Sequence, residues 1–212
     1  MIKFSRRDVG FSLIEVAIAV VVISIIVGFA LKGGKLVNSV KLRSVLDQVE
    51  SFRIAMQDFQ MRYGAWPGDF HFAKEVINDS LENGSGNGSI SSLDDSKRFW
   101  MHLIAAGLLN VELVNGLPQS KFGGYFSVSS SVDGHSGVWF ILCGGTEDNK
   151  KFTGILSPKE AYFLDKGNDT GKPLIGDIRI IKSSTASGEV IENSNYNFKN
   201  ENKDCVVLFK AL

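Results

Sequence analysis

The sequence has little proline and cysteine, and no excess charge of either sign. Only 4 of its 212 residues are proline and 2 are cysteine, against 22 glycines. Because glycine supplies backbone conformations that turns require, this ratio predicts a loop-rich β portion. The formal net charge is zero. That argues against a general nucleic-acid binder, which needs a clustered basic face to neutralise phosphates, so we expect no nucleic-acid partner.

A recognisable set of catalytic side chains is also missing. The histidines, His71, His102 and His135, lack the spacing of metal ligands, and His102 is most simply a partly buried helix residue. Residues 134–137 read Gly-His-Ser-Gly and lack the G-x-S-x-G form of a nucleophile turn. Residues 33–35 read Gly-Gly-Lys without the earlier glycine of a phosphate loop. We therefore expect that the chain is not an enzyme.

The first ten residues differ in charge from the rest. Lys3, Arg6 and Arg7 outweigh Asp8 to give a net of +2, and the remaining 20 basic and 22 acidic residues give 11–212 a net of −2. A short basic head on a mildly acidic body is typical of a targeting leader. We therefore predict a leader peptide at 1–10.

An apolar run follows this leader. Residues 11–31 comprise 21 residues, close to the ~20 that a helix needs to cross a hydrocarbon core, and predict a transmembrane helix. One alternative is a secretory signal peptide, but its apolar region is usually about 7–15 residues long and ends in a small-residue site, of which 28–31 is a weak version. Another is a simple signal anchor, with the basic leader held in the cytoplasm.

Neither alternative explains Glu15. A carboxylate inside an apolar span costs about 2.5–3.5 kcal/mol on insertion scales, so such residues usually have a partner and a role. The order Gly10, Phe11, Glu15 after a basic leader resembles the signature of type IV prepilins and type II secretion pseudopilins. The resemblance implies that a membrane-bound prepilin peptidase cleaves between Gly10 and Phe11 and methylates the new N-terminal Phe11.

The same resemblance implies a role for Glu15 in assembly. Its carboxylate would pair with the Phe11 amine of a neighbouring subunit, which lowers the burial penalty of both charges and sets the axial register. One position departs from the family. Many major pilins have a helix-bending proline at the twenty-second mature position, where this chain has Lys32. This difference argues against a major-pilin role.

Beyond Gly33-Gly34, which we expect to weaken the helix locally, the apolar residues follow helical spacing. Steps of three and four place them on one stripe and predict an amphipathic continuation of the helix over 32–63. Gly64 then ends the helix and Pro67-Gly68 turns the chain. The stripe comprises Leu42, Val45, Leu46, Val49, Phe52, Met56, Phe59 and Tyr63.

The remainder, 64–212, predicts a globular head. Residues 63–70 resemble a Y-x-x-x-P-G-D-F segment of a subgroup of pilin-like proteins, and 100–108 resemble the W-x-x-L-x-x-A-G-L helix of that subgroup. Short β-like runs follow at 125–128, 138–142, 177–181 and 206–209. The predicted fold class is α+β, with a long N-terminal transmembrane and amphipathic helix followed by a small head with an antiparallel β-sheet.

Two loops are candidate calcium sites. In the first, Asn83, Ser85, Asn87 and Asp94 occupy the first, third, fifth and twelfth positions of an EF-hand-like spacing, although only Asp94 is a carboxylate. The second loop, 165–171, offers Asp165 and Asp169. The alternative for both is a solvated turn, which Asn, Asp and Gly commonly make. We expect no other cofactor.

The two cysteines, Cys143 and Cys205, are candidates for a disulfide. If the head lies on the outer side of the membrane, an oxidising compartment favours their pairing. Closing a loop of about sixty residues would stabilise the head by roughly 4 kcal/mol in the chain-entropy model. The alternative is a pair of free buried thiols.

The sequence thus predicts a prepilin-like structural subunit in the inner (cytoplasmic) membrane, single-pass with its head on the periplasmic side. Its partners would be the prepilin peptidase, other pilin-like subunits, the assembly machinery and the membrane. It would form a type IV pilus or a type II secretion pseudopilus, two assemblies that the sequence does not distinguish. The alternative is a non-polymerising, membrane-anchored periplasmic binding module. A secreted protein, the third option, would begin near Lys32.

Overall fold

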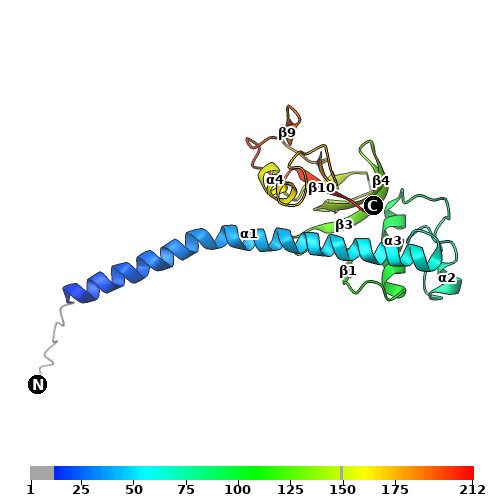
Figure 1. The fold of residues 1–212 in the computed structure, drawn as a ribbon, viewed down its shortest axis with the longest axis horizontal. Helices are drawn as coiled ribbons and strands as arrows, with labels where there is room; N and C mark the ends of the chain where they lie inside the picture. The colour runs from blue at the N-terminus through cyan, green and yellow to red at the C-terminus, as the bar shows by residue number, and fades with distance from the viewer. Residues whose placement is uncertain (1–11, 149) are drawn as a thin grey trace, which may run out of the picture. The chain divides into compact units, whose positions relative to one another are not determined.

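The computed structural model describes residues 12–148 and 150–212, and all of their side chains except those of 29–39. The chain divides into two compact units, Met1–Lys41 and Leu42–Leu212, which are described separately below. Helix α1 (Leu13–Tyr63) begins in the first unit and ends in the second, and it continues through Gly33-Gly34 (Figure 1). The predicted α+β class, with an N-terminal helix and antiparallel sheets, is confirmed.

The membrane-spanning part of the prediction is not confirmed. Within the part of the chain that the structure describes, no helix meets the length and hydropathy expected of a membrane span.

The second unit is built on the C-terminal half of α1. The predicted apolar stripe is confirmed, because its central side chains are at most 2% exposed: Val45, Val49, Phe52, Met56 and Phe59. Phe52 packs edge-on against Trp100 and Phe126, with ring centroids 4.7 and 5.1 Å apart. Burying each such side chain contributes about 1.5–3 kcal/mol, so this stripe fastens the helix to the rest of the head.

Three shorter helices complete the helical part: α2 (Ala73–Val76), α3 (Leu93–Ala105) and α4 (Pro158–Lys166). Both α3 and α4 begin with a capping box, in which the side chain of a serine and that of an acidic residue three positions later bond each other's backbone N–H. The W-x-x-L helix predicted from the sequence is α3. Trp100 and Leu103 on this helix are fully buried.

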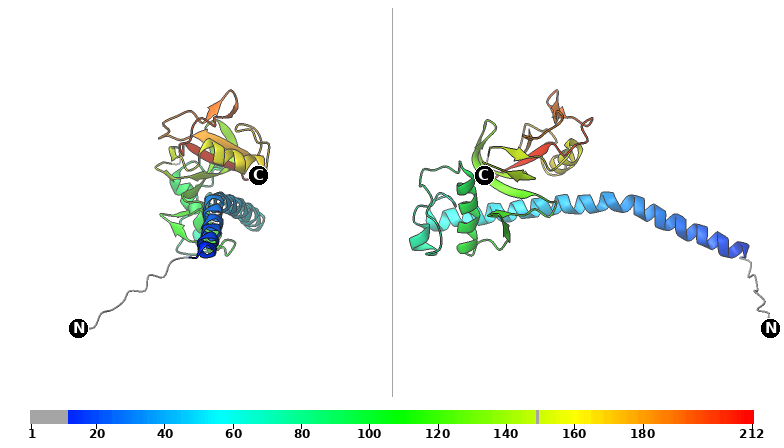
Figure 2. Two further views of the ribbon diagram at one scale, coloured as in Figure 1. Left: turned by 90° about the vertical axis from the view of Figure 1, so that its left-hand side faces the viewer. Right: turned by 180° about the vertical axis from the view of Figure 1, so that it is seen from behind.

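The main sheet has four antiparallel strands in the order β3-β4-β10-β7. These strands are β3 (Tyr125–Val132), β4 (His135–Cys143), β7 (Ile178–Lys182) and β10 (Cys205–Lys210). They overlap the four predicted β-like runs. The last strand of the chain, β10, pairs with both β4 and β7 and so lies inside the sheet. Figure 2 shows the same ribbon, with β10 in red, from two further directions.

Three two-stranded hairpins accompany this sheet. They are formed by β1 (Leu113–Val114) with β2 (Leu117–Pro118), β5 (Gly145–Thr146) with β6 (Phe152–Thr153), and β8 (Ile191–Glu192) with β9 (Asn195–Tyr196).

The two faces of the main sheet bury different sets of side chains. Phe126, Phe140 and Val207 belong to the core that includes α1 and α3. Trp139 and Leu208 belong to a second cluster on the opposite face, which also contains Phe152 of β6. This alternation follows from the period of two in β-strands.

The predicted disulfide is not formed, because the two cysteines lie on opposite faces of the sheet. Cys143 packs in the cluster of Trp139, whereas Cys205 packs in the core beside Val207. Both thiols are free and buried. Burial raises the pKa of each to about 12. A bond between them would require one strand to shift by a residue, which would move each of its side chains to the opposite face of the sheet and disrupt the packing of both clusters.

Candidate functional site

The N-terminal segment is the first candidate site. Gly10 and Phe11 lie outside the described residues, so cleavage and methylation there stay predictions. The described chain enters the helix at Ser12, whose carbonyl accepts a hydrogen bond from the N–H of Val16 (3.2 Å). Glu15 lies in the first turn of α1. A carboxylate is favoured there by the positive end of the helix dipole.

The side chain of Glu15 is exposed and, among the described residues, has no ion-pair partner. Its neighbours along the described helix are apolar, except Ser12 three residues before it. A carboxylate in such a position lacks the partner that it would need once water is removed. Glu15 is therefore available to a group from outside this chain.

The start of helix α1, on both sides of Glu15, exposes an unusually apolar surface. Its large side chains are between 47% and 92% exposed: Leu13, Ile14, Val16, Ile18, Val20, Val21, Val22, Ile23, Ile25, Ile26 and Val27. The hydroxyl of Ser24 donates to the carbonyl of Val20 (2.7 Å), so this polar group needs no water. A helix that is apolar all round is typical of a buried or membrane environment. Contiguous apolar surface of this kind marks an interaction site.

The first candidate calcium loop is organised around a carboxylate. Asp69, which is only 5% exposed, accepts hydrogen bonds from the Ser85 hydroxyl (3.0 Å) and from the N–H groups of Asn87 (2.9 Å) and Gly88 (2.7 Å). The loop therefore directs donors inward, whereas calcium requires oxygen ligands.

The other predicted ligands of this loop also have partners or lie elsewhere. The side-chain oxygen of Asn83 accepts from the N–H of Lys74 (2.8 Å), and that of Asn87 accepts from Ser89 (2.8 Å). Asp94 lies in the first turn of α3. The loop is thus a folded turn, and calcium binding by it stays a prediction.

The two carboxylates of the second candidate loop accept hydrogen bonds from different donors. Asp165 is fully buried and accepts from the N–H of Gly171 (2.9 Å) and from the hydroxyl of Tyr196 (2.7 Å). Burial raises the pKa of Asp165 above its ordinary value. Asp169 instead accepts from the N–H of Ile178 (2.8 Å). Within the described residues, no group of three or more His, Cys, Asp or Glu side chains could hold a metal ion.

A fully buried histidine, His102 of α3, connects the W-x-x-L helix to the P-G-D-F turn. Nδ1 of His102 accepts the N–H of Gly68 (3.0 Å), and Nε2–H donates to the carbonyl of Glu82 (2.9 Å). Its ring stacks on Phe59 of α1, with centroids 6.1 Å apart. Burial, and then the charge of Arg98, lower the pKa of His102. Sequence reasoning missed these contacts, although the paired P-G-D-F and W-x-x-L motifs hinted that their elements meet.

Gly68 shows why that motif requires glycine. Its φ is +80°, and a Cβ atom at this position would lie 2.6 Å from the carbonyl oxygen of Asp95. The turn therefore lies directly on the backbone of α3 and delivers its N–H to His102. Any larger residue would separate the two elements.

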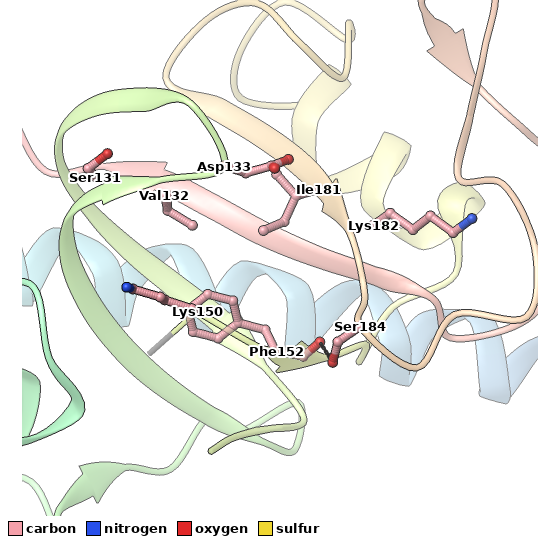
Figure 3. Close-up of a pocket in the computed structure, with 8 residues that line it drawn as sticks. All are labelled: Ser131, Val132, Asp133, Lys150, Phe152, Ile181, Lys182 and Ser184. Carbon is pink, nitrogen blue, oxygen red and sulfur yellow. Dashed lines mark hydrogen bonds between the residues drawn. The ribbon is translucent and has the colours of Figure 1, made fainter. Parts of the chain in front are cut away.

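The outer face of the sheet carries a pocket of about 410 Å³. Figure 3 shows it between the tip of the β3–β4 hairpin, β6 and the end of β7. The lining mixes apolar side chains with charges of both signs: Ser131, Val132, Asp133, Lys150, Phe152, Ile181, Lys182 and Ser184. Lys182 already pairs with Glu189 (2.5 Å). These residues form no arrangement of nucleophile, acid and base.

Comparison with known proteins identifies the N-terminal segment. Residues 6–31 match the model of the prokaryotic N-terminal methylation motif. This motif is the signature of type IV pilin-like and pseudopilin proteins, so the resemblance stated from Gly10, Phe11 and Glu15 is confirmed. It supports a type IV pilin-like precursor. No curated protein and no solved structure matches the chain.

Proposed function

We propose that this chain is the precursor of a filament subunit. Prepilin peptidase cleaves it between Gly10 and Phe11 and methylates Phe11, and the mature chain assembles into a type IV pilus or a type II secretion pseudopilus. The observation that carries this proposal is the methylation motif at 6–31, within which α1 exposes the apolar side chains from Leu13 to Val27. The role is structural and not enzymatic.

The mechanism of assembly rests on Glu15. Residues 11–31 anchor the precursor in the inner membrane with the head, 64–212, on the periplasmic side, and 32–63 continue the helix into the head. During assembly the apolar helices of neighbouring subunits pack together, and each Glu15 carboxylate pairs with the Phe11 amine of a neighbour. The pairing neutralises two charges that would otherwise be buried alone. Such head-to-tail contacts do not form a closed ring, so further subunits can add and build a helical filament.

The partners in this proposal are the peptidase, other pilin-like subunits, the assembly machinery and the membrane, and nucleic acid is not among them. It includes no cofactor and admits one metal, calcium, in the loops of Asn83 and Asp165. A thermal midpoint that rises with added calcium and falls with chelator would support that metal, whereas an unchanged midpoint would exclude it.

The deciding experiment is mass spectrometry of the N-terminus of the protein from the membrane fraction of a host with an active prepilin peptidase. We expect an N-methylated Phe11. Retention of Met1 would instead favour the anchored binding module, for which the pocket of Figure 3 is the first place to look. A start beyond Ala30 would indicate a secreted protein.

Two variants separate processing from assembly. Glu15→Gln keeps the shape of the side chain but removes its charge, so we expect normal cleavage and a large loss of filaments. Ser24→Ala changes a polar side chain in the same helix that bonds only its own backbone, and it should assemble as the wild type does. Filaments formed equally by both variants would contradict the role of Glu15.

A further inference from the structure

Residues 64–90, here called the clasp segment, fold back on themselves. The N–H of Gly84 donates to the carbonyl of Phe70 (2.8 Å), and the N–H of Gly86 donates to the carbonyl of Asp69 (2.9 Å). The carboxylate of Asp69 also holds the N–H groups of Asn87 and Gly88. These hydrogen bonds join residues 69–70 to residues 84–88, so they hold the two halves of the segment together.

His102 of α3 fastens both ends of the clasp segment. One ring nitrogen accepts from Gly68 near the start, and the other donates to the carbonyl of Glu82 near the end. Because Gly68 N–H is a donor, Nδ1 must be unprotonated and the ring must be the neutral Nε2–H tautomer. The ring is fully buried between these contacts and Phe59.

The charged groups around this ring do not favour a proton on it. On α3 itself, Arg98 lies close by and pairs with Asp95 (2.5 Å) and with Glu82 of the clasp segment (3.5 Å). Asp69, on the turn that bears Gly68, directs its carboxylate to residues 85–88. From α1, Arg62 donates to the carbonyl of Ala106 (3.2 Å). The carboxylates near His102 are therefore already engaged with other donors.

Protonation of His102 would place two hydrogen-bond donors face to face. The new Nδ1–H would face the N–H of Gly68, the existing hydrogen bond would be lost, and a positive charge would be buried near Arg98. Each of these effects destabilises the closed arrangement. Gly68 has no room to move inward, because it already touches the backbone of α3.

We propose that His102 is a proton-operated latch that holds the clasp segment on α3 and α1 when neutral and releases both of its ends when protonated. Release uncovers the aromatic surface of Phe59 and Phe70, which are at most 7% exposed in the closed head. The head thereby contains an acid-sensitive part that is separate from the sheet. This inference does not depend on filament assembly.

Hydrogen exchange of the full chain in non-ionic detergent tests the latch. The measured quantity is the protection of a peptide covering 64–72, that is, the intrinsic exchange rate divided by the observed rate. If only the open segment accepts the proton, protection falls about tenfold per pH unit below about pH 6.5, down to the lowered pKa of the closed form. Protection of β10 should be higher than that of 64–72 at every pH in this range, because the segment opens while the sheet stays folded. Unchanged protection of 64–72 with pH, or equal protection of 64–72 and β10, would overturn the proposal.

Two variants assign the effect to one histidine. His102→Gln cannot titrate, so the protection of 64–72 should lose its pH dependence. His71→Gln removes an exposed histidine from the same segment and should keep the full dependence. A fall that persists in His102→Gln refutes the latch. If that variant does not fold, exchange at the imidazole C2–H of wild-type His102 replaces it. Its titration midpoint must lie at the pH where the fall in protection levels off, and a midpoint at another pH refutes the latch.

Discussion

Replacing Asp69 by alanine removes the acceptor of three hydrogen bonds that shape the loop 85–88. The carboxylate is 5% exposed and receives one hydroxyl and two backbone N–H groups. A hydrogen bond to a charged group contributes about 1.5–3 kcal/mol, but the freed donors of this partly exposed loop can turn to water. We therefore expect a total loss of about 3 kcal/mol rather than the sum of three separate values.

The assay is thermal unfolding of the full chain in non-ionic detergent. For a protein of this length, about 3 kcal/mol corresponds to a decrease of roughly 6–12 °C in Tm. The matched control is Asp79→Ala, because the Asp79 side chain is 97% exposed and lies 4.0 Å from its only ion-pair partner among the described residues, Lys74. It should change stability by less than about 0.5 kcal/mol. A loss below about 1 kcal/mol in Asp69→Ala would show that other contacts hold the loop.

Three further perturbations test other parts of the head. Gly68→Ala should lower the free energy of unfolding by more than about 2 kcal/mol, and Gly64→Ala by only about 1 kcal/mol. Both glycines have positive φ, but only Gly68 lies against a neighbouring backbone. Equal melting temperatures of the two variants would contradict this reasoning. Cys143 and Cys205 should resist alkylation in the folded protein, and both should react once the protein is unfolded without reductant. If neither cysteine is alkylated in the unfolded protein, the two form a disulfide. The raised pKa of Asp165 means that its stability contribution is fully present below about pH 3.8 and is lost as the pH rises through the folded-state value. Asp165→Asn should remove this component from the pH profile of the unfolding free energy, and an unchanged profile would argue against it.

The sequence predicted those features that repeat along the chain. The stripe from Val45 to Phe59 follows the helical period, and the burial of α1 confirms it. The strands followed from short apolar runs, and the W-x-x-L pattern placed α3 correctly. In each case neighbouring residues carry the same information several times, so one ambiguous position does not change the result.

Features that depend on a single long-range contact were not predicted. Compartment arguments favoured a disulfide, but whether Cys143 and Cys205 can meet depends on strand order and on the face to which each side chain points. The partners of His102, Gly68 and Glu82, are 34 and 20 residues away in sequence. The spacing of Asn83, Ser85 and Asn87 resembles that of cation ligands, but the sequence alone did not reveal that Asp69 accepts hydrogen bonds from this loop.

The position of β10 has a consequence for how the protein is made. This strand contains residues 205–210 of a 212-residue chain, yet it lies between β4 and β7 and bonds to both. The sheet therefore cannot be completed until residues 205–210 have been synthesised, since before then β4 and β7 have no strand between them. The N-terminal helix, by contrast, needs only residues close to it in sequence and is available early. A chain that lacks residues 205–210 therefore loses a central strand of its sheet and not merely an edge.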